Sequence, residues 1–172
     1  MRRVAFFGRF QPFHLGHLYA SLWLLERFDE IVFIIGMSSE SYTITNPFTP
    51  GERIVMIRRA LTEHNVDLSR VITVTLPTLP IGVQSVSTVL AYIPKVDALA
   101  SANPIIIRLF SDYGVKVITP PLVRRDVYRG SYIRQLMIKN DPTWRKLVPK
   151  SVAEYIDEIK GVERLVMISK SY

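Results

Sequence analysis

One short segment near the start of the chain carries an arginine and two histidines. Arg9 offers a planar set of N–H donors that suits phosphate oxygens. His14 and His17 are three residues apart where a helix is expected to begin, so both side chains share a face near the positive end of the helix dipole. Gly8 and Gly16 leave room for the close approach of a bulky ligand. The segment therefore predicts a phosphate-binding loop that can also donate hydrogen bonds to charge developing in a transition state.

The two histidines have other interpretations. A His-x-x-His pair can form half of a zinc site, but the chain has no cysteine, and its third histidine, His64, is expected at the end of a different helix. The pair could also be purely structural, although the neighbouring arginine and glycines favour phosphate binding. The glycine-rich fingerprints of dinucleotide-binding and P-loop proteins are missing from the sequence. A dehydrogenase and a P-loop hydrolase are therefore disfavoured.

A second candidate phosphate site lies at Gly130-Ser131-Tyr132-Ile133-Arg134. We expect Ser131 to cap a helix there, with Arg134 three residues later on the same face. A hydroxyl, backbone N–H groups and a guanidinium would then converge at one helix terminus, which suits the outer phosphates of a nucleotide. Taken alone, the same pattern also fits a simple cap followed by a surface arginine.

The composition narrows the class of protein. The 172 residues include 22 Lys and Arg against 15 Asp and Glu, a net charge of +7 that fits a phosphate-bearing partner as well as a solvated basic surface. The absence of cysteine excludes disulfides, thiolate metal sites and a cysteine nucleophile. The first apolar run is too short for a signal peptide, and no run approaches the roughly 20 residues of a membrane-spanning helix. We expect a soluble cytoplasmic protein with one domain over residues 1–172.

Apolar runs typical of buried strands alternate with segments of helical periodicity. Strands are expected at residues 3–7, 30–35, 71–76, 96–100 and 115–118. Helices are expected at residues 15–28, 50–64, 83–93, 104–113 and 131–139, with a last one from 151. Capping boxes at residues 49–52 and 151–154 mark two of the helix starts, and we expect the last dozen residues to fray.

This alternation predicts crossover connections and therefore a parallel sheet. The expected fold class is α/β, a single doubly wound Rossmann-like domain with helices on both faces of the sheet. Ligands of such sheets bind beyond the carboxyl ends of the strands, so the loops after residues 7, 35, 76 and 100 are expected to form the site.

A family resemblance joins these features. The sequence His14-Leu15-Gly16-His17 matches the H-x-G-H signature of the nucleotidyltransferase superfamily, and the longer string from Gly8 to His17 resembles the archaeal-type nicotinamide-nucleotide adenylyltransferases. The resemblance covers nearly the whole chain. Companion segments follow in the family's order: Asn46-Pro47-Phe48-Thr49, Gly51-Glu52-Arg53, Asn103-Pro104, Gly130-Ser131-x-x-Arg134 and Gly161-Val162-Glu163-Arg164-Leu165.

The resemblance implies transfer of AMP from ATP to nicotinamide mononucleotide, giving NAD and pyrophosphate by direct in-line attack without a covalent intermediate. The catalytic residues would be His14, His17, Arg9 and Arg134. The residues expected to bind ATP and its phosphates are Gly8, Arg9, Phe10, His14, Gly16, His17, Asn103, Gly130, Ser131 and Arg134. Mg²⁺ would bind through the phosphates rather than through protein side chains. Relatives form homo-oligomers, which we expect here too, and we expect neither a nucleic-acid nor a membrane partner.

The acceptor is expected near Gly36, Met37, Ile81, Gly82 and Ser85. After the third strand the family carries an asparagine and a tryptophan that contact the nicotinamide nucleotide, and residues 77–85 of this chain include neither. These departures leave open the same chemistry on another phosphorylated acceptor, of flavin or pantetheine type. A separate alternative is a nucleotide- or nucleic-acid-binding module that uses the basic face without turnover.

Overall fold

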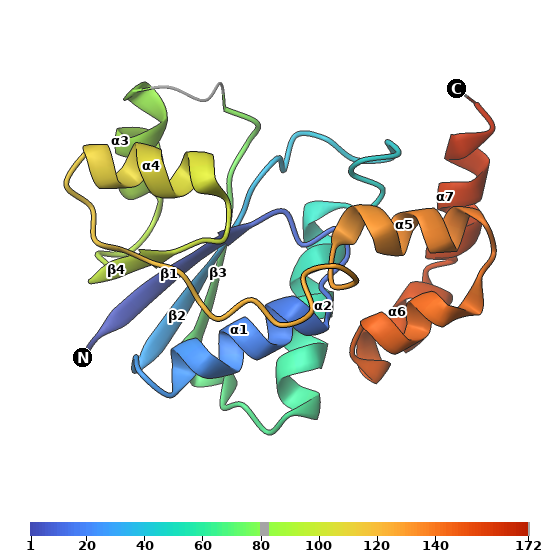
Figure 1. The fold of residues 1–172 in the computed structure, drawn as a ribbon, viewed down its shortest axis with the longest axis horizontal. Helices are drawn as coiled ribbons and strands as arrows, with labels where there is room; N and C mark the ends of the chain where they lie inside the picture. Colours follow the sequence, from blue (N-terminus) through green and yellow to red (C-terminus); the bar gives the residue numbers. More distant parts are fainter. Residues whose placement is uncertain (80–82, 172) are drawn as a thin grey trace. The chain divides into compact units, whose positions relative to one another are not determined.

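Five parallel strands form the sheet of this computed structural model, which describes residues 1–79 and 83–171 (Figure 1). In chain order the strands are β1 (Arg3–Gly8), β2 (Glu30–Ile35), β3 (Val71–Thr75), β4 (Ala98–Ala100) and β5 (Val117–Ile118). They pair in the order β3-β2-β1-β4-β5, and all four pairings are parallel. The order reverses at β1, so the loop that leaves β1 starts where such sheets bind ligands. The expected Rossmann-like α/β fold is confirmed.

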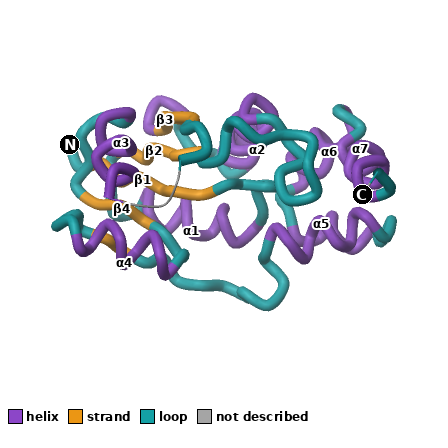
Figure 2. The backbone as a smooth tube through the Cα atoms, turned by 90° about the horizontal axis from the view of Figure 1, so that it is seen from above, coloured by secondary structure: helices purple, strands orange, loops and turns teal. Residues whose placement is uncertain are grey.

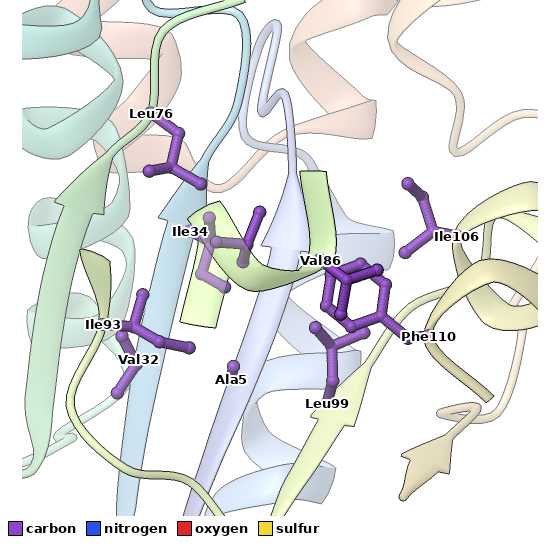
Figure 3. Close-up of a cluster of buried hydrophobic side chains, with 10 residues drawn as sticks. Ala5, Val32, Ile34, Leu76, Val86, Ile93, Leu99, Ile106 and Phe110 are labelled. Carbon is purple, nitrogen blue, oxygen red and sulfur yellow. The ribbon is translucent and has the colours of Figure 1, made fainter. Parts of the chain in front are cut away.

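One face of the sheet carries a continuous apolar cluster to which helices α3 (Val83–Tyr92) and α4 (Pro104–Asp112) contribute (Figure 3). Successive side chains of a strand point to opposite faces, so Val32 and Ile34 of β2 reach this cluster while Phe33 points away. Phe33 packs on the opposite face with Phe6, ring centroids 5.8 Å apart. Because all three β2 residues are fully buried, the sheet is covered on both faces, as its long apolar runs predict.

The chain separates into two compact units. Unit 1 consists of Met1–Gly8, Ala20–Ser39 and Ser69–Leu122, and it holds the sheet with α3 and α4. Unit 2 consists of Arg9–Tyr19, Glu40–Leu68 and Val123–Tyr172, and its helices are α2 (Pro50–Glu63), α5 (Gly130–Ile138), α6 (Lys150–Glu158) and α7 (Gly161–Ser169). Within unit 2, α6 packs on α2, and α7 packs on α5 and α6 (Figure 2). The expectation of a single domain stays a prediction.

The remaining helices are short or shared between the units. Helix α1 (Leu15–Leu25) begins in unit 2 and ends in unit 1, and short 3₁₀ helices span Leu68–Arg70 and Pro142–Leu147. In the described ranges, no helix is both long enough and apolar enough to cross a membrane.

The first expected capping box is confirmed at the start of α2. The Oγ1 of Thr49 accepts from the N–H of Glu52 at 3.2 Å, and the Glu52 carboxylate accepts from the N–H of Thr49 at 2.9 Å. Pro50 takes the first helical position, where its missing N–H costs nothing.

The two expected serine caps are wrong. Helix α5 begins one residue early, at Gly130, so Ser131 stands inside its first turn. Helix α6 also begins before its expected cap, and the N–H of Ser151 donates to the carboxylate of Glu63 on α2 at 2.9 Å. A partner from another helix has replaced the local serine cap that the sequence pattern predicted.

The C-terminal residues form a helix where we expected fraying. Lys160 takes the left-handed conformation with φ +51°, which ends α6 and lets α7 begin at Gly161. A Cβ at Gly161 would lie 2.9 Å from the ring of Phe48, so only glycine lets α7 start this close. The side chain of Leu165 is fully buried, which fixes the helix to the rest of unit 2.

Candidate active site

The segment that follows β1, residues 9–17, is called the first loop here; it includes the start of α1. Its two histidine rings stack on each other, with centroids 3.6 Å apart and planes inclined by 19°. The backbone N–H of His14 donates to Nδ1 of His17 at 3.2 Å, and the N–H of His17 donates to Nδ1 of His14 at 3.3 Å. A helix leaves its first N–H groups without intrahelical partners, and these imidazoles satisfy two such groups at the start of α1. The spacing of the two histidines therefore brings them together, as predicted.

These hydrogen bonds determine where each imidazole carries its hydrogen. An Nδ1 that accepts a hydrogen bond is not protonated, so each neutral ring carries its N–H at Nε2. Burial lowers the pKa of His14 from 6.5 to about 3. Burial, and then the charge of His14, lower the pKa of His17 well below 6.5. Both histidines are therefore neutral at pH 7, and each has an Nε2–H that can donate a hydrogen bond.

Aromatic side chains enclose the ring of His17. Phe10 meets it edge-on with centroids 4.8 Å apart, and Phe13 lies 5.5 Å away. Both phenylalanines are buried. Phe10 has φ +53°, a left-handed conformation that is costly for a bulky residue and must be held by its surroundings. This packing keeps the histidine pair in one orientation.

Gly16 allows close packing rather than an open space. A Cβ on Gly16 would lie 3.0 Å from Cβ of Tyr128 and 3.1 Å from the ring of His14. The room that we expected for a ligand beside Gly16 is therefore filled by these two side chains. Gly16 instead lets the His14 ring fold back over the start of α1.

Gln11 ties the first loop to the segment before α2. Its Nε2 donates to the carbonyl oxygen of Phe48 at 2.8 Å, and its Oε1 accepts from the N–H of Phe48 at 3.0 Å. Both residues are buried, so this pairing satisfies four polar groups away from water. The main-chain oxygen of Gln11 accepts from Nη1 of Arg134 at 2.7 Å. The two candidate phosphate segments therefore meet at Gln11.

Arg53 of α2 also reaches the first loop. Its sequence position indicates only a helix start, yet its side chain is fully buried. Nη1 of Arg53 donates to the carbonyl oxygen of Arg9 at 2.9 Å, and Nε donates to the carbonyl oxygen of Thr49 at 3.4 Å. Arginines are mostly exposed in folded proteins, so the sequence pattern alone could not single out this one.

Three guanidinium groups share this neighbourhood. Burial, and then the charge of Arg9, lower the pKa of Arg53 and of Arg134 to about 10. Both groups stay charged at neutral pH, and the repulsion among the three cations favours a bound anion. These charges, together with the two imidazole donors that the first loop carries, suit a polyphosphate.

Gly130 begins α5 directly against the first loop. A Cβ on Gly130 would lie 2.8 Å from the carbonyl oxygen of Gln11 and 3.0 Å from Nη1 of Arg134, so any side chain would push these hydrogen-bond partners apart. Ser131, next in the chain, is exposed in the first turn of α5.

Three other candidate residues lie at the carboxyl edge of the sheet in unit 1. Gly8 ends β1, and its carbonyl oxygen accepts from the N–H of Gly36 at 2.9 Å. Met37 follows with φ +52° in the left-handed region. The loops after β1 and β2 therefore leave the sheet side by side, as expected for the ligand-binding edge.

Two further candidates, Asn103 and Ser85, belong to unit 1. Asn103 caps α4, and its Oδ1 accepts from the N–H of Ile105 at 3.0 Å. Ser85 lies in the first turn of α3. Ile81 and Gly82 lie outside the described residues.

The groups around the first loop that can donate hydrogen bonds are guanidinium groups and imidazoles protonated at Nε2. Such N–H groups can donate to phosphate oxygens. Within residues 1–79 and 83–171, no group of three or more His, Cys, Asp or Glu side chains could hold a metal ion.

A family model described as cytidylyltransferase-like matches residues 5–136 of the chain. The chain belongs to the cytidylyltransferase-like family. It is 55% identical to an uncharacterized protein of Archaeoglobus fulgidus, over 95% of this chain and 93% of that protein. It is 47% identical to a nicotinamide-nucleotide adenylyltransferase of Saccharolobus solfataricus, over 96% of this chain and 95% of that enzyme. These relatives confirm the resemblance to archaeal adenylyltransferases and the prediction of a nucleotidyltransferase enzyme.

A solved structure has the same fold as this member of the cytidylyltransferase-like family. It is a bifunctional NMN adenylyltransferase/ADP ribose pyrophosphatase from Francisella tularensis, complexed with AMP and a manganese ion, with a TM-score of 0.75 and 22% identity. The match covers 99% of this chain and 53% of the other, so this chain spans about half the length of that protein. At this identity the likeness concerns the fold alone.

Proposed function

We propose that this protein transfers AMP from ATP to nicotinamide mononucleotide, forming NAD and releasing pyrophosphate. The observation that carries the proposal is the stacked pair of neutral histidines on the first loop, which also carries Arg9. The guanidinium groups of Arg53 on α2 and Arg134 on α5 donate to the backbone of the same loop. Such a site offers fixed positive charge and hydrogen-bond donors to a triphosphate. The acceptor is inferred from the names of relatives that are 40–47% identical over nearly the whole chain.

The reaction needs no nucleophile from the protein. A phosphate oxygen of the acceptor attacks the α-phosphorus of ATP in line, and pyrophosphate leaves with the electron pair of the broken P–O bond. Catalysis then consists of positioning and of stabilising phosphoryl charge. His14 and His17 would donate through Nε2 to phosphate oxygens as that charge builds up. Arg9 and Arg134 would hold the outer phosphates, with the exposed Ser131 beside them.

Mg²⁺ would enter as part of the substrate, bound to ATP. This ion usually keeps several water ligands and binds phosphate oxygens, so it needs few ligands from the protein. The N–H donors of the first loop are suited to the phosphates around such an ion and not to the ion itself.

A second candidate function keeps the chemistry and changes the acceptor to another phosphorylated molecule, of flavin or pantetheine type. The observation that favours it is the segment 77–85, which has neither the asparagine nor the tryptophan of the resembling family. A binding module without turnover is the third possibility, and it would need the same loop to hold ATP without reaction.

The test measures pyrophosphate release from Mg-ATP with nicotinamide mononucleotide, flavin mononucleotide, phosphopantetheine or no acceptor. The proposal expects release only with nicotinamide mononucleotide and the appearance of NAD in equal amount. Release with another acceptor alone would assign the second function, and ATP binding without release would assign the third. His17→Ala, purified in the same way, controls for contaminating activity.

We further propose that the enzyme acts in the cytoplasm, as a homo-oligomer, without nucleic-acid or membrane partners. Size-exclusion chromatography with light scattering tests the oligomeric state. A monomer at working concentration would contradict this part of the proposal.

A further inference from the structure

Buried arginines hold the first loop from two helices. Arg53 of α2 donates to the carbonyl oxygen of Arg9 at 2.9 Å, and Arg134 of α5 donates to that of Gln11 at 2.7 Å. These two carbonyl groups flank Phe10, whose φ of +53° is a conformation that the surroundings must maintain. The path of the loop at this point therefore depends on both arginines.

The hydrogen bond from Arg53 determines the orientation of one peptide. A peptide unit is planar and trans, so a carbonyl oxygen held toward Arg53 turns the N–H of Phe10 to the opposite side. The same hydrogen bond restricts ψ of Arg9, and so limits the directions in which the Arg9 side chain can leave the loop. A rotation of this peptide would redirect a cation that we assign to phosphate binding.

Arg53 is anchored too firmly to reach a ligand by itself. It is fully buried, and its Nε donates to Thr49, the residue that caps α2. The carboxylate of Glu52 completes that cap and accepts two hydrogen bonds of 2.7 Å from Arg164 of α7. The scaffold behind Arg53 is therefore rigid, and any effect of Arg53 on a ligand passes through the loop.

We propose that Arg53 is a positioning residue for phosphate binding. By holding the Arg9–Phe10 peptide, it orients the side chain of Arg9 toward the nucleotide. The role of Arg9 in this inference rests on the proposed function. Arg53 is conformationally locked and touches no substrate. Its contribution is the hydrogen bond to the loop rather than its charge alone.

Two substitutions separate the hydrogen bond from the charge. Arg53→Lys keeps the charge but loses the planar group that reaches the Arg9 carbonyl, and Arg53→Met removes both. The binding of tripolyphosphate, measured by calorimetry, is expected to weaken at least tenfold in both variants. The KM for ATP is expected to rise to a similar extent, with a smaller change in kcat. Arg53→Lys carries the test where Arg53→Met does not fold.

Arg70→Lys is the matched control. Arg70 also donates to backbone carbonyl oxygens, those of Leu25, Phe28 and Asp29. It belongs to unit 1, whereas the first loop belongs to unit 2. Its substitution is expected to lower the melting temperature and to leave tripolyphosphate affinity unchanged. Arg53→Lys must show the opposite pattern, with a larger loss of affinity than of stability.

A double-mutant cycle tests whether Arg53 acts through Arg9. In an Arg9→Ala background, Arg53→Lys is expected to change tripolyphosphate affinity less than twofold, because the group that it positions is already gone. Additive losses would overturn the proposal, and so would an affinity within twofold of wild type in Arg53→Lys alone. Tripolyphosphate binding can be measured without turnover. Wild-type protein that binds tripolyphosphate but releases no pyrophosphate from Mg-ATP would refute the proposed function, and the test of Arg53 could still be carried out.

Discussion

His14 and His17 each accept, at Nδ1, a hydrogen bond from the other residue's backbone N–H. This reciprocity means that neither ring is positioned independently, because each imidazole both caps the helix start and orients the other. Removal of one ring leaves a backbone N–H of the other residue without its partner. The effects of substituting the two histidines are therefore expected to be far from additive.

His17→Ala should lower turnover by roughly 10²–10³, the usual loss for one donor to a transition state. Helix α1 should still form, because alanine is a better helix former than histidine. Pyrophosphate release and far-ultraviolet circular dichroism measure the two effects. His64→Ala is the control, since His64 lies at the exposed end of α2 with its Nδ1 against the carbonyl oxygen of Ala60. Activity of His17→Ala within threefold of wild type would remove His17 from the mechanism.

The burial of His14 should make the fold sensitive to acid. The pKa of His14 is about 3 in the folded protein and about 6.5 in the unfolded chain, so below pH 6.5 only the unfolded chain takes up the proton. Stability is therefore lost as the pH falls from about 6.5 toward 3. At pH 5 the loss from His14 is about 2 kcal/mol, by the rule that one pH unit corresponds to 1.36 kcal/mol.

Urea denaturation at pH 8 and pH 5 measures this loss. His14→Asn, which has no ionisable ring, should lose about 2 kcal/mol less between the two pH values than wild type. Equal losses in the two proteins would contradict the assignment of His14 as a buried neutral ring.

Arg134→Lys should weaken ATP binding or turnover at least tenfold. Lysine keeps the charge but loses the planar group, which both donates to the Gln11 carbonyl and is proposed to hold phosphate. Steady-state kinetics measure the change, and Arg59→Lys in an exposed ion pair with Glu158 is the control. Unchanged kcat and KM in Arg134→Lys would leave Arg134 with a structural role only.

Gly130→Ala should impair the enzyme through crowding. The added Cβ would stand 2.8 Å from the Gln11 carbonyl oxygen, and overpacking of this kind typically costs about 1–3 kcal/mol. We expect a lower melting temperature together with at least tenfold lower kcat/KM. Gly51→Ala is the control because its Cβ would meet nothing closer than 4.0 Å, at Thr49 Oγ1. A fully active Gly130→Ala would mean that the loop and α5 can separate freely.

Nicotinamide mononucleotide should bind with a weak KM. Residues 77–85 contain no tryptophan to stack on the nicotinamide ring and no asparagine to hydrogen-bond to it. The two missing interactions together cost about 1.5–2.5 kcal/mol of binding free energy, or roughly ten- to seventyfold in affinity. Trp144 is buried and therefore does not offer its ring to a ligand. Tyr42 is 53% exposed, with the guanidinium of Arg164 4.5 Å from its ring, and is the candidate to stack on nicotinamide instead. Calorimetric titration of the mononucleotide decides the matter, and submicromolar binding that survives in Tyr42→Ala would show that the departures are compensated elsewhere.

Local pattern was enough to predict the strands, most of the helices and the contact between the two histidines, but not the helix at Gly161–Ser169. The strand at 30–35 has the expected bounds, and the Thr49 capping box forms because its two partners are three residues apart. His14 and His17 likewise meet through sequence spacing alone. Where a contact joins residues close in sequence, the pattern contains the information needed to predict it.

Contacts between distant segments were the ones that the sequence did not predict. Gln11 meets Phe48 and Arg134, and Arg53 meets Arg9, across separations that no local spacing reports. The cap expected at Ser151 failed for the same reason, since Glu63 of another helix satisfies that N–H. Burial of a polar side chain depends on the folded neighbourhood, so a buried arginine looks like any helix arginine until the helices are packed.

The pairing of Gln11 with both backbone groups of Phe48 gives the enzyme a built-in reporter. The amide hydrogen of Phe48 donates to Gln11, so its rate of exchange with solvent depends on how often the first loop opens. Substrate that stiffens the loop would slow this exchange, and a substitution that loosens the loop would speed it up. The exchange rate of one backbone amide thus reports on the state of the loop, and the measurement needs no bound ligand.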